Sequence, residues 1–259
     1  MNSFELSNSL NTNWLGKKII YLDEIDSTNQ EVKRIAENQP NGTIVIAEKQ
    51  TRGKGRLGRV WCSAEGTSLL FSILLKPEIA PNKIAGITLA CGFAVCKAIR
   101  NYTNLNALIK WPNDIIIGNK KLCGILTEMS ASAEKINYAV VGIGVNVNTT
   151  EFDDEISGKA TSLQIEKGAL IDRAKLFGVI IEALEKCFDD YFSDPDNIIT
   201  DDYKALCATI NREVTIKRGS QTLTGTAIDI KSSGDLVVRL ADNSVTEVSS
   251  GEVTVQGIY

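Results

Sequence analysis

Residues 138–148 read YAVVGIGVNVN, and branched apolar residues alternate along this stretch with glycine or asparagine. The apolar face carries Val141, Ile143, Val145 and Val147. The opposite face carries Gly142, Gly144, Asn146 and Asn148. Because successive side chains of a β-strand point to opposite sides, this period of two predicts a strand with one face in a hydrophobic core. A face stripped of side chains indicates that either another backbone or a ligand lies against it.

The segments before and after this strand mix helices and strands. Five more segments are expected to be strands: 17–25, 43–50, 67–77, 115–117 and 122–127. Three are expected to be helices: 82–100, 170–192 and 201–208. A further helix is expected to begin at Ser27-Thr28-Asn29, because Thr28 and Glu31 have the spacing of a capping box. The pair Gly118-Asn119 predicts a hairpin turn, whereas the acidic segment 149–168 is expected to be a surface loop.

The character of the chain changes after Ile210. Five short alternating segments follow within 50 residues: 213–218, 226–230, 236–240, 244–249 and 252–255. Short strands at this spacing predict a small β-barrel or sandwich attached to the larger domain. We therefore expect a large domain over residues 18–210 and a small one over 211–259, preceded by a loosely ordered segment, 1–17.

The 259 residues contain no histidine. This excludes Ser-His-Asp and Cys-His catalysis, zinc bound by histidine, and histidine as a general base. The chain has 28 basic and 32 acidic residues, so its net charge of −4 provides no overall field for nucleic acid. Any catalysis must rely on other groups.

The six cysteines form no C-x-x-C pair: Cys62, Cys91, Cys96, Cys123, Cys187 and Cys207. A zinc or redox site is therefore not indicated, and reduced core cysteines in a cytoplasmic protein are expected. The N-terminal residues lack the pattern of a signal peptide. No stretch reaches the roughly 18 uninterrupted apolar residues of a membrane span, so no membrane partner is expected.

The segment 50–61, QTRGKGRLGRVW, carries four cations and three glycines but no acid. Glycines let backbone N–H groups approach an anion closely, and guanidinium groups bind phosphate or carboxylate with two parallel hydrogen bonds. Trp61 offers a face on which a base could stack. The spacing differs from that of a P-loop. Composition alone leaves two interpretations open: an anion-binding loop, or a solvated basic loop that contacts nucleic acid non-specifically.

The segment 110–114, KWPND, leads into the predicted hairpin, and Lys121 follows its turn. Lys121 is either an ordinary edge-strand charge or a fixed cation in the wall of a pocket, and taken alone the first interpretation is favoured. Ser27-Thr28-Asn29 is expected at a helix N-terminus, which is also a place for polar contacts with a ligand.

These motifs, in their order and spacing, closely resemble the biotin–protein ligase family. The shared blocks are Asp-Ser-Thr-Asn, Q-T-x-G-[RK]-G-R-x-G-R-x-W, K-W-P-N-D…K-L-x-G-I-L-x-E and G-I-G-x-N-x-N. Shorter matches follow at Ala160-Thr161-Ser162-Leu163, at Gly225…Ile228-Asp229…Gly234-Asp235-Leu236 and at Ser250-Gly251-Glu252-Val253. The resemblance extends over about residues 18–255.

The resemblance implies an α+β fold, with a mixed or antiparallel sheet packed with helices as in class II synthetases, and a small C-terminal SH3-like β-barrel. It implies an enzyme that forms biotinyl-5′-AMP from biotin and ATP, with Mg²⁺ accompanying the ATP. The biotinyl group then passes to one lysine of a biotin carboxyl carrier protein, such as that of acetyl-CoA carboxylase. Family members pair their catalytic sheets edge to edge, which makes a homodimer compatible with the resemblance.

The resemblance also implies roles for individual residues. The biotin-binding set would be Ser27, Thr28, Asn29, Gln50, Gly53, Lys54, Gly55, Arg56, Lys121, Gly124 and Gly144. The nucleotide-binding set would be Arg56, Arg59, Trp61, Asn113, Lys121 and Asn146. Arg56 and Lys121 would be catalytic through their charge. No metal ligand is assigned, although Asp114 could contribute indirectly to Mg²⁺ binding.

The sequence departs from the family pattern at Lys54, where arginine is common. The difference matters if this side chain binds the ligand with two parallel hydrogen bonds, and does not matter if the loop binds there through its backbone. Only about 17 residues precede the first block, too few for the helix-turn-helix domain of repressor members, so no operator binding is expected. Two alternatives remain. One is lipoate or octanoate transfer within the same superfamily, and the other is a nucleic-acid-binding module.

Overall fold

The computed structural model describes residues 1–132, 135–197, 199–218, 221–249 and 251–259. Its large sheet has seven strands in the order β1-β2-β3-β7-β6-β5-β4. Their bounds are Ile19–Ile25 (β1), Ile44–Gln50 (β2), Ser68–Leu75 (β3), Ala107–Lys110 (β4), Asp114–Ile117 (β5), Lys120–Ala131 (β6) and Ile136–Asn146 (β7). β1 pairs with β2 in parallel and all other neighbours are antiparallel. The prediction of a mixed sheet is confirmed.

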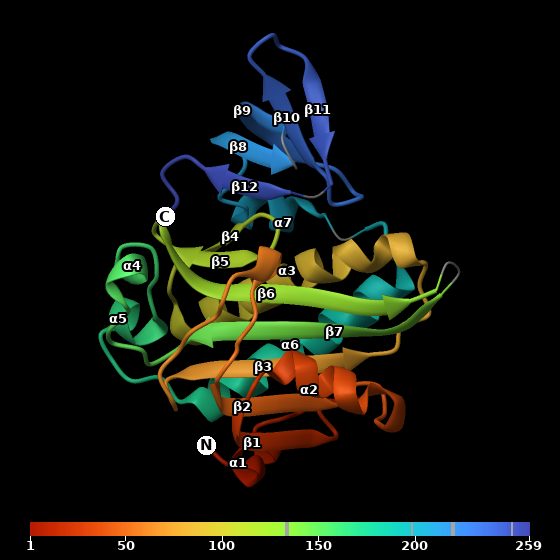
Figure 1. The fold of residues 1–259 in the computed structure, drawn as a ribbon, viewed down its shortest axis with the longest axis vertical. Coiled ribbons are helices and arrows are strands. Elements are labelled where there is room, and N and C mark those ends of the chain that lie inside the picture. The colour runs from red at the N-terminus through yellow and green to blue at the C-terminus, as the bar shows by residue number, and fades with distance from the viewer. Residues whose placement is uncertain (133–134, 198, 219–220, 250) are drawn as a thin grey trace.

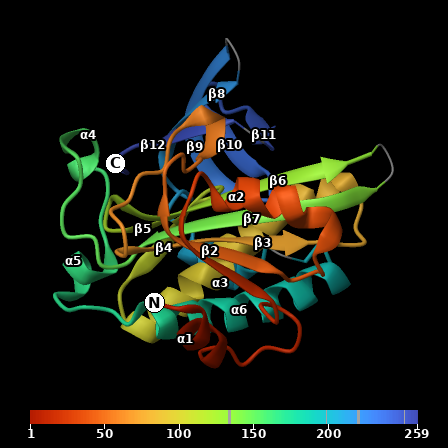
Figure 2. The same ribbon diagram turned by 60° about the horizontal axis from the view of Figure 1, so that its bottom comes forward.

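Helices cover both faces of this sheet (Figures 1 and 2). α2 (Thr28–Ile35) lies on one face, while α3 (Ile84–Thr103) and α6 (Arg173–Ser193) pack on the other. The shorter helices are α1 (Ser3–Asn8), α4 (Asp154–Ser157), α5 (Leu163–Lys167) and α7 (Asp201–Leu206). Single 3₁₀ turns occur at Ala36–Asn38, Arg56–Gly58 and Pro81–Lys83. Segment 149–168, expected to be a loop, thus contains two short helices.

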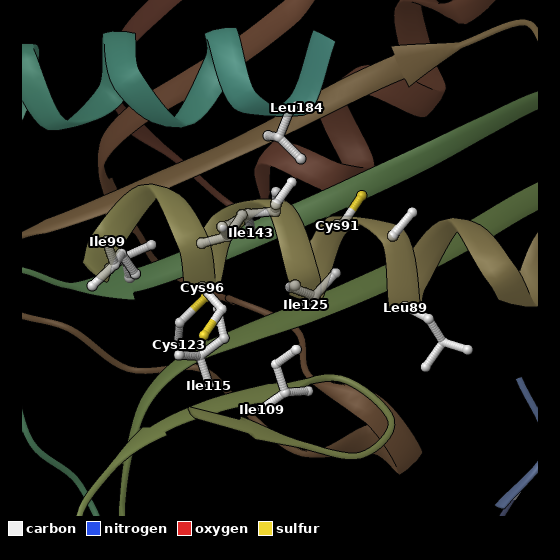
Figure 3. Packing of buried hydrophobic residues seen from close by; sticks show 14 of the residues in the cluster. Leu89, Cys91, Cys96, Ile99, Ile109, Ile115, Cys123, Ile125, Ile143 and Leu184 are labelled. Carbon is white, nitrogen blue, oxygen red and sulfur yellow. The ribbon is translucent and has the colours of Figure 1, made fainter. Parts of the chain in front are cut away.

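The alternation along β7 separates the core from the opposite face of the sheet. Val141, Ile143 and Val145 are buried in the cluster with α3 and α6, as the period of two predicts. Figure 3 shows Ile143 and Ile125 beside Cys91 of α3, with Cys96 and Cys123 close together. All six cysteines are free, and four of them are buried. The glycine face of β7 therefore points toward the side of the sheet on which α2 lies.

The segment Pro81–Thr103 is long and apolar enough to cross a membrane by length and composition, with a mean hydropathy of 1.3 over its most apolar window. No other helix in the described ranges meets this criterion. A core helix satisfies it equally well, because a helix that is apolar all round can be buried in protein instead. α3 is such a helix: it packs against α6, β4, β5 and β6.

Residues after α7 form a separate antiparallel sheet in the order β11-β10-β9-β8-β12, shown in blue in Figure 1. The strands are β8 (Glu213–Arg218), β9 (Gln221–Ile230), β10 (Leu236–Leu240), β11 (Val245–Val248) and β12 (Glu252–Val255). All five expected strands are present, so the small β domain is confirmed. We keep 18–210 and 211–259 as proposed domain limits. Ser250, part of the last shared motif, lies outside the described residues.

The N-terminal segment differs from the expectation of loose order. α1 begins with a capping box between Asn2 and Glu5, and Leu6 and Leu15 are fully buried. The Glu185 carboxylate on α6 accepts hydrogen bonds from the backbone N–H groups of Asn13, Trp14 and Leu15, at 2.7–3.0 Å. The order comes from a partner more than 150 residues away in the chain, which local sequence does not reveal.

Replacing Glu185 with alanine should destabilise the fold by about 3 kcal/mol, since three backbone donors lose a charged acceptor. Burial acts to raise the pKa of Glu185, but hydrogen bonds from these N–H groups hold it below its ordinary value. A lowered folded-state pKa means that the stabilisation is present above the unfolded pKa and is lost as the pH falls through the folded pKa. In urea unfolding, the difference in free energy of unfolding between Glu185→Ala and the unsubstituted protein should therefore be smaller at acidic pH than at neutral pH. Glu182→Ala, an exposed change on the same helix, is the control, and equal stability of the two variants would contradict the prediction.

The predicted capping box at Thr28 is wrong. The N-cap position is occupied by Ser27, and its side chain makes no capping hydrogen bond. Thr28 is the first helical residue, and its N–H donates instead to the Gln50 side chain at 2.8 Å. Glu31 pairs with Arg34 on the helix surface. The polar side chains at this helix end are turned toward the sheet, where Thr28 contacts β2 and Asn29 contacts β3 and β6.

Candidate active site

The bare face of β7 forms the floor of a narrow slot. Gly144 is directly opposite Gly124 of β6, so two neighbouring strands lack side chains at the same level. A Cβ atom on Gly144 would lie 2.7 Å from the indole of Trp61, and one on Gly124 would lie 2.9 Å from it. The sequence left open whether a backbone or a ligand covers this face. In the structure the ring of Trp61 does so.

One wall of the slot is a network of buried polar side chains. The N–H and hydroxyl groups of Thr28 both donate to Gln50 Oε1, at 2.8 and 3.1 Å. The Ser72 hydroxyl on β3 lies 2.7 Å from Thr28 Oγ1 and 2.5 Å from Asn29 Oδ1. Asn29 Nδ2 donates to Glu128 on β6 at 2.8 Å. Such a connected network fixes the donors and acceptors that a polar ligand would meet.

The basic loop folds as a small hairpin over the slot. The N–H of Gly55 donates to the carbonyl of Arg59 at 2.7 Å, and the N–H of Trp61 donates to the carbonyl of Gly53 at 3.0 Å. A Cβ atom on Gly53 would lie 2.4 Å from the Trp61 carbonyl oxygen, so only glycine allows this close approach of the two loop arms. The hairpin places the Trp61 side chain inside the slot.

Trp61 leaves little free space there. The remaining cavity has a volume of about 50 Å³, whereas ligand pockets usually measure roughly 300–1,000 Å³. Trp61 Nε1 is buried, and no hydrogen-bond partner for it exists among the described residues. A buried donor without a partner costs free energy. The indole is therefore poorly accommodated and could be displaced by a ligand that satisfies the slot better.

Positive charges gather at the open end of the slot. Lys121 Nζ lies 2.7 Å from Asp114 Oδ1 and 5.6 Å from the centre of the Trp61 ring. The Arg56 guanidinium donates to Asn113 Oδ1 at 2.8 Å and to the Gly251 carbonyl at 3.2 Å. Burial lowers the pKa of Arg56, although an arginine side chain stays protonated in proteins. These cations are held in place and would attract an anion.

A second, larger cavity of about 530 Å³ adjoins the slot and extends toward the small β domain. Arg59, in its wall, forms an ion pair with Glu252 of β12. Asn146, at the end of β7, donates to the Thr161 carbonyl at 3.1 Å. The backbone of Lys121 is fixed by the same segment, since the Thr161 N–H donates to its carbonyl at 2.9 Å. The Ala160–Leu163 motif therefore supports two of the predicted site residues, Asn146 and Lys121.

The two predicted residue sets line these two cavities, with several residues in common. All residues of the biotin set except Gly53 line the slot. All six residues of the nucleotide set line the larger cavity. The shared lining residues are Gly55, Arg56, Trp61, Asn113 and Lys121. The structure thus brings together predicted residues that are up to 119 positions apart, between Ser27 and Asn146, around one continuous space.

Several lining residues were not predicted from the sequence. Phe71, Ile125, Leu126 and Ile143 line the slot, while Tyr259 lines the larger cavity. Gly142 of the glycine face and Lys110 of the KWPND segment also line these cavities, although neither was given a role of its own. Ser72 supports the polar wall from behind. Ser72 could have been noticed in the sequence, because it is a polar residue inside the apolar run of segment 67–77. Tyr259 carried no local signal.

The residues around the site do not form a cage for Mg²⁺. Within the described ranges, no group of three or more His, Cys, Asp or Glu residues could hold a metal ion. Asp114 has one oxygen against Lys121 and Asn113, and the other accepts a hydrogen bond from Tyr259. Both Asp114 oxygens therefore have protein partners in this structure, and we assign no step to a protein-bound Mg²⁺.

Comparison with known proteins supports the sequence resemblance. Residues 21–146 match the sequence model of the biotin/lipoate A/B protein ligase family, and residues 209–255 match that of the biotin protein ligase C-terminal domain. The bifunctional ligase/repressor BirA of Bacillus spizizenii is 36% identical over 255 residues, which cover 96% of this chain and 77% of that protein. The chain belongs to the biotin protein ligase family. It is accordingly a ligase.

Two further relatives agree with this assignment. The biotin–[acetyl-CoA-carboxylase] ligase of Mycobacterium tuberculosis is 30% identical over 218 residues, covering 82% of this chain and 79% of that protein. The biotin protein ligase from Aquifex aeolicus, solved in complex with biotin and ATP, superposes with a TM-score of 0.82 at 29% identity. This superposition covers 93% of the present ligase and 99% of the Aquifex chain.

Proposed function

We propose that this ligase joins biotin to ATP, releasing pyrophosphate, and then transfers biotin from biotinyl-5′-AMP to a lysine of a biotin carboxyl carrier protein. The observation that carries the proposal is the pair of adjoining cavities with Arg56 and Lys121 at their junction. A small polar slot suits the biotin ring system, and the larger cationic cavity suits a nucleotide. Their junction is where a carboxylate and an α-phosphate would meet.

The first step requires two anions to approach each other. A biotin carboxylate oxygen attacks the α-phosphorus, and the bond to the leaving pyrophosphate breaks. Arg56 and Lys121 lower the barrier by neutralising the charge that would otherwise repel the reactants. Neither needs to gain or lose a proton, which agrees with a chain that contains no histidine.

The polar wall would recognise the biotin head group. The ureido ring presents two N–H donors and one carbonyl acceptor, which need matched partners inside a slot. Thr28, Asn29 and Gln50 supply hydroxyl and amide groups there, ordered by Ser72. Gly124 and Gly144 leave space for the bicyclic ring once Trp61 has moved. Displaced Trp61 would then stack on the adenine of the adenylate.

In the second step the acceptor lysine amine attacks the biotinyl carbonyl carbon, and AMP leaves. By resemblance the acceptor is a carrier domain of acetyl-CoA carboxylase or another biotin enzyme, and the reaction takes place in the cytoplasm. The Bacillus relative is named a bifunctional ligase/repressor, and the present proposal concerns the ligase reaction alone. A nucleic-acid module is disfavoured because two of the four loop cations, Arg56 and Arg59, are engaged with Asn113, Gly251 and Glu252.

Biotin binding should displace Trp61 and change its fluorescence. Because the indole fills the slot, the ligand can enter only after the ring has left, and the emission should shift toward that of a solvated tryptophan. A fluorescence titration with biotin measures this shift. Trp61→Phe should abolish the change, since Trp14 and Trp111 lie outside the slot. An equal change in Trp61→Phe would show that Trp61 does not block the site.

The proposal is tested by incubating the purified chain with ATP and either biotin, lipoate or octanoate, followed by mass spectrometry of the products. We expect biotinyl-5′-AMP in the biotin sample alone. An adenylate formed only with lipoate or octanoate would support transfer of those acids instead.

A further inference from the structure

Tyr259 connects the small β domain to the charged end of the active site. After β12, Ile258 is buried and its N–H donates to the Val255 carbonyl at 3.1 Å. The N–H of Tyr259 then donates to the Asn119 carbonyl, at the β5–β6 turn, at 2.8 Å. Figure 1 shows this end of the chain beside the large sheet, below β12. The backbone contacts hold the phenol side chain against the KWPND segment.

The phenol contacts two charged residues at once. Its hydroxyl donates a hydrogen bond to Asp114 Oδ2. Its ring centre lies 3.5 Å from the Lys110 ammonium, a cation–π contact. The other Asp114 oxygen, Oδ1, lies 2.7 Å from Lys121 Nζ. Asp114 is therefore held from both sides, by a tyrosine on one oxygen and by a lysine on the other.

Lys110 depends strongly on this ring. It is only 7% exposed, and burial lowers its pKa to about 8, against the opposing effect of Asp114. Among the residues that the structure describes, no carboxylate lies within ion-pair distance of it. The aromatic face is its close electrostatic contact. Loss of the ring would leave a buried cation less well stabilised.

We infer that Tyr259 is a positioning residue of this ligase, one that fixes Asp114, and through it Lys121, for contact with the nucleotide. This inference rests on the function proposed above. Asp114 and Tyr259 line the larger cavity and are absent from the lining of the slot. Tyr259 should therefore affect the use of ATP more strongly than the binding of biotin, whose ring lies in the slot.

A freed Asp114 would harm the site in two ways. An unanchored carboxylate can rotate toward the cavity and repel the phosphates. Lys121 would also lose the fixed partner that sets its position before the nucleotide binds, and preorganised charges are the more effective ones in catalysis. Tyr259→Phe removes the hydroxyl and keeps the ring over Lys110, so it isolates the contact with Asp114.

We expect Tyr259→Phe to raise the KM for ATP in biotin-dependent pyrophosphate exchange by about 10-fold, the effect of losing one hydrogen bond to a charged group. Its Kd for biotin, from calorimetry without ATP, should change much less than the KM for ATP, and its melting temperature should match that of the unsubstituted protein. Tyr21→Phe is the matched control. Tyr21 also donates to a carboxylate, Glu48, at 3.0 Å, and it lies outside both cavities.

A double-mutant cycle decides whether Tyr259 acts through Asp114. In an Asp114→Asn background, Tyr259→Phe should have little further effect on the KM for ATP, because the hydroxyl no longer holds a carboxylate. An equal 10-fold effect in both backgrounds, or an unchanged KM in the single variant, would overturn the inference. No exchange in the unsubstituted protein would instead overturn the proposed function, and this inference with it.

Discussion

Replacing Lys121 with alanine should lower biotin-dependent pyrophosphate exchange by about 100- to 1,000-fold, the usual effect of removing one charge aimed at a transition state. Lys121 lies at the junction of the two cavities. Its ammonium is the group that would bridge the biotin carboxylate and the α-phosphate. The effect should fall mainly on kcat, because the charge matters most when the two anions are closest.

The fold should tolerate this substitution. The Lys121 side chain is 29% exposed, and partly exposed ion pairs contribute little to stability. Asp114 would keep its contacts with Asn113 and Tyr259. Lys120→Ala, the neighbouring exposed lysine, is the matched control and should retain full exchange. Normal exchange in Lys121→Ala would remove Lys121 from the mechanism.

Replacing Gly144 with valine should raise the KM for biotin by about 10- to 100-fold. A side chain on Gly144 points into the slot, where its Cβ alone would lie 2.7 Å from the present position of the indole. Overfilling a packed space costs about 1–3 kcal/mol, which is the source of the expected factor. Valine suits the middle of a β-strand, so β7 itself should persist.

Two measurements check this prediction. Calorimetry gives the Kd for biotin, and exchange kinetics give the KM for ATP, which should change much less because Gly144 does not line the larger cavity. Gly158→Val is the control, since no atom lies within 4 Å of the Cβ position there. Unchanged biotin affinity in Gly144→Val would place the biotin ring elsewhere.

The features that were predicted correctly depend on local patterns. The alternation in 138–148 identified β7 and its two faces, and the hairpin at Gly118-Asn119 followed from the turn residues. β4 was missed, because Ala107–Lys110 is only four residues long and has no alternation to reveal it. The order of the N-terminal segment was missed because Glu185, which orders it, lies on α6.

The same contrast between local sequence patterns and contacts with distant residues applies to the site. The motif residues were recognised, and their grouping around one space agrees with the proposed roles. The position of Trp61 inside the slot could not be predicted, because it depends on two glycines of different strands coming into register. The contact of Tyr259 with Asp114 spans 145 positions and depends on how the small β domain sits on the large sheet.

The central claim is tested most directly by the intact mass of a biotin carrier domain after incubation with this ligase, biotin and ATP. We predict a mass increase of one biotinyl group, located on one lysine, that requires ATP and is lost with Lys121→Ala. An unmodified carrier domain under conditions in which a known biotin ligase modifies it would contradict the account.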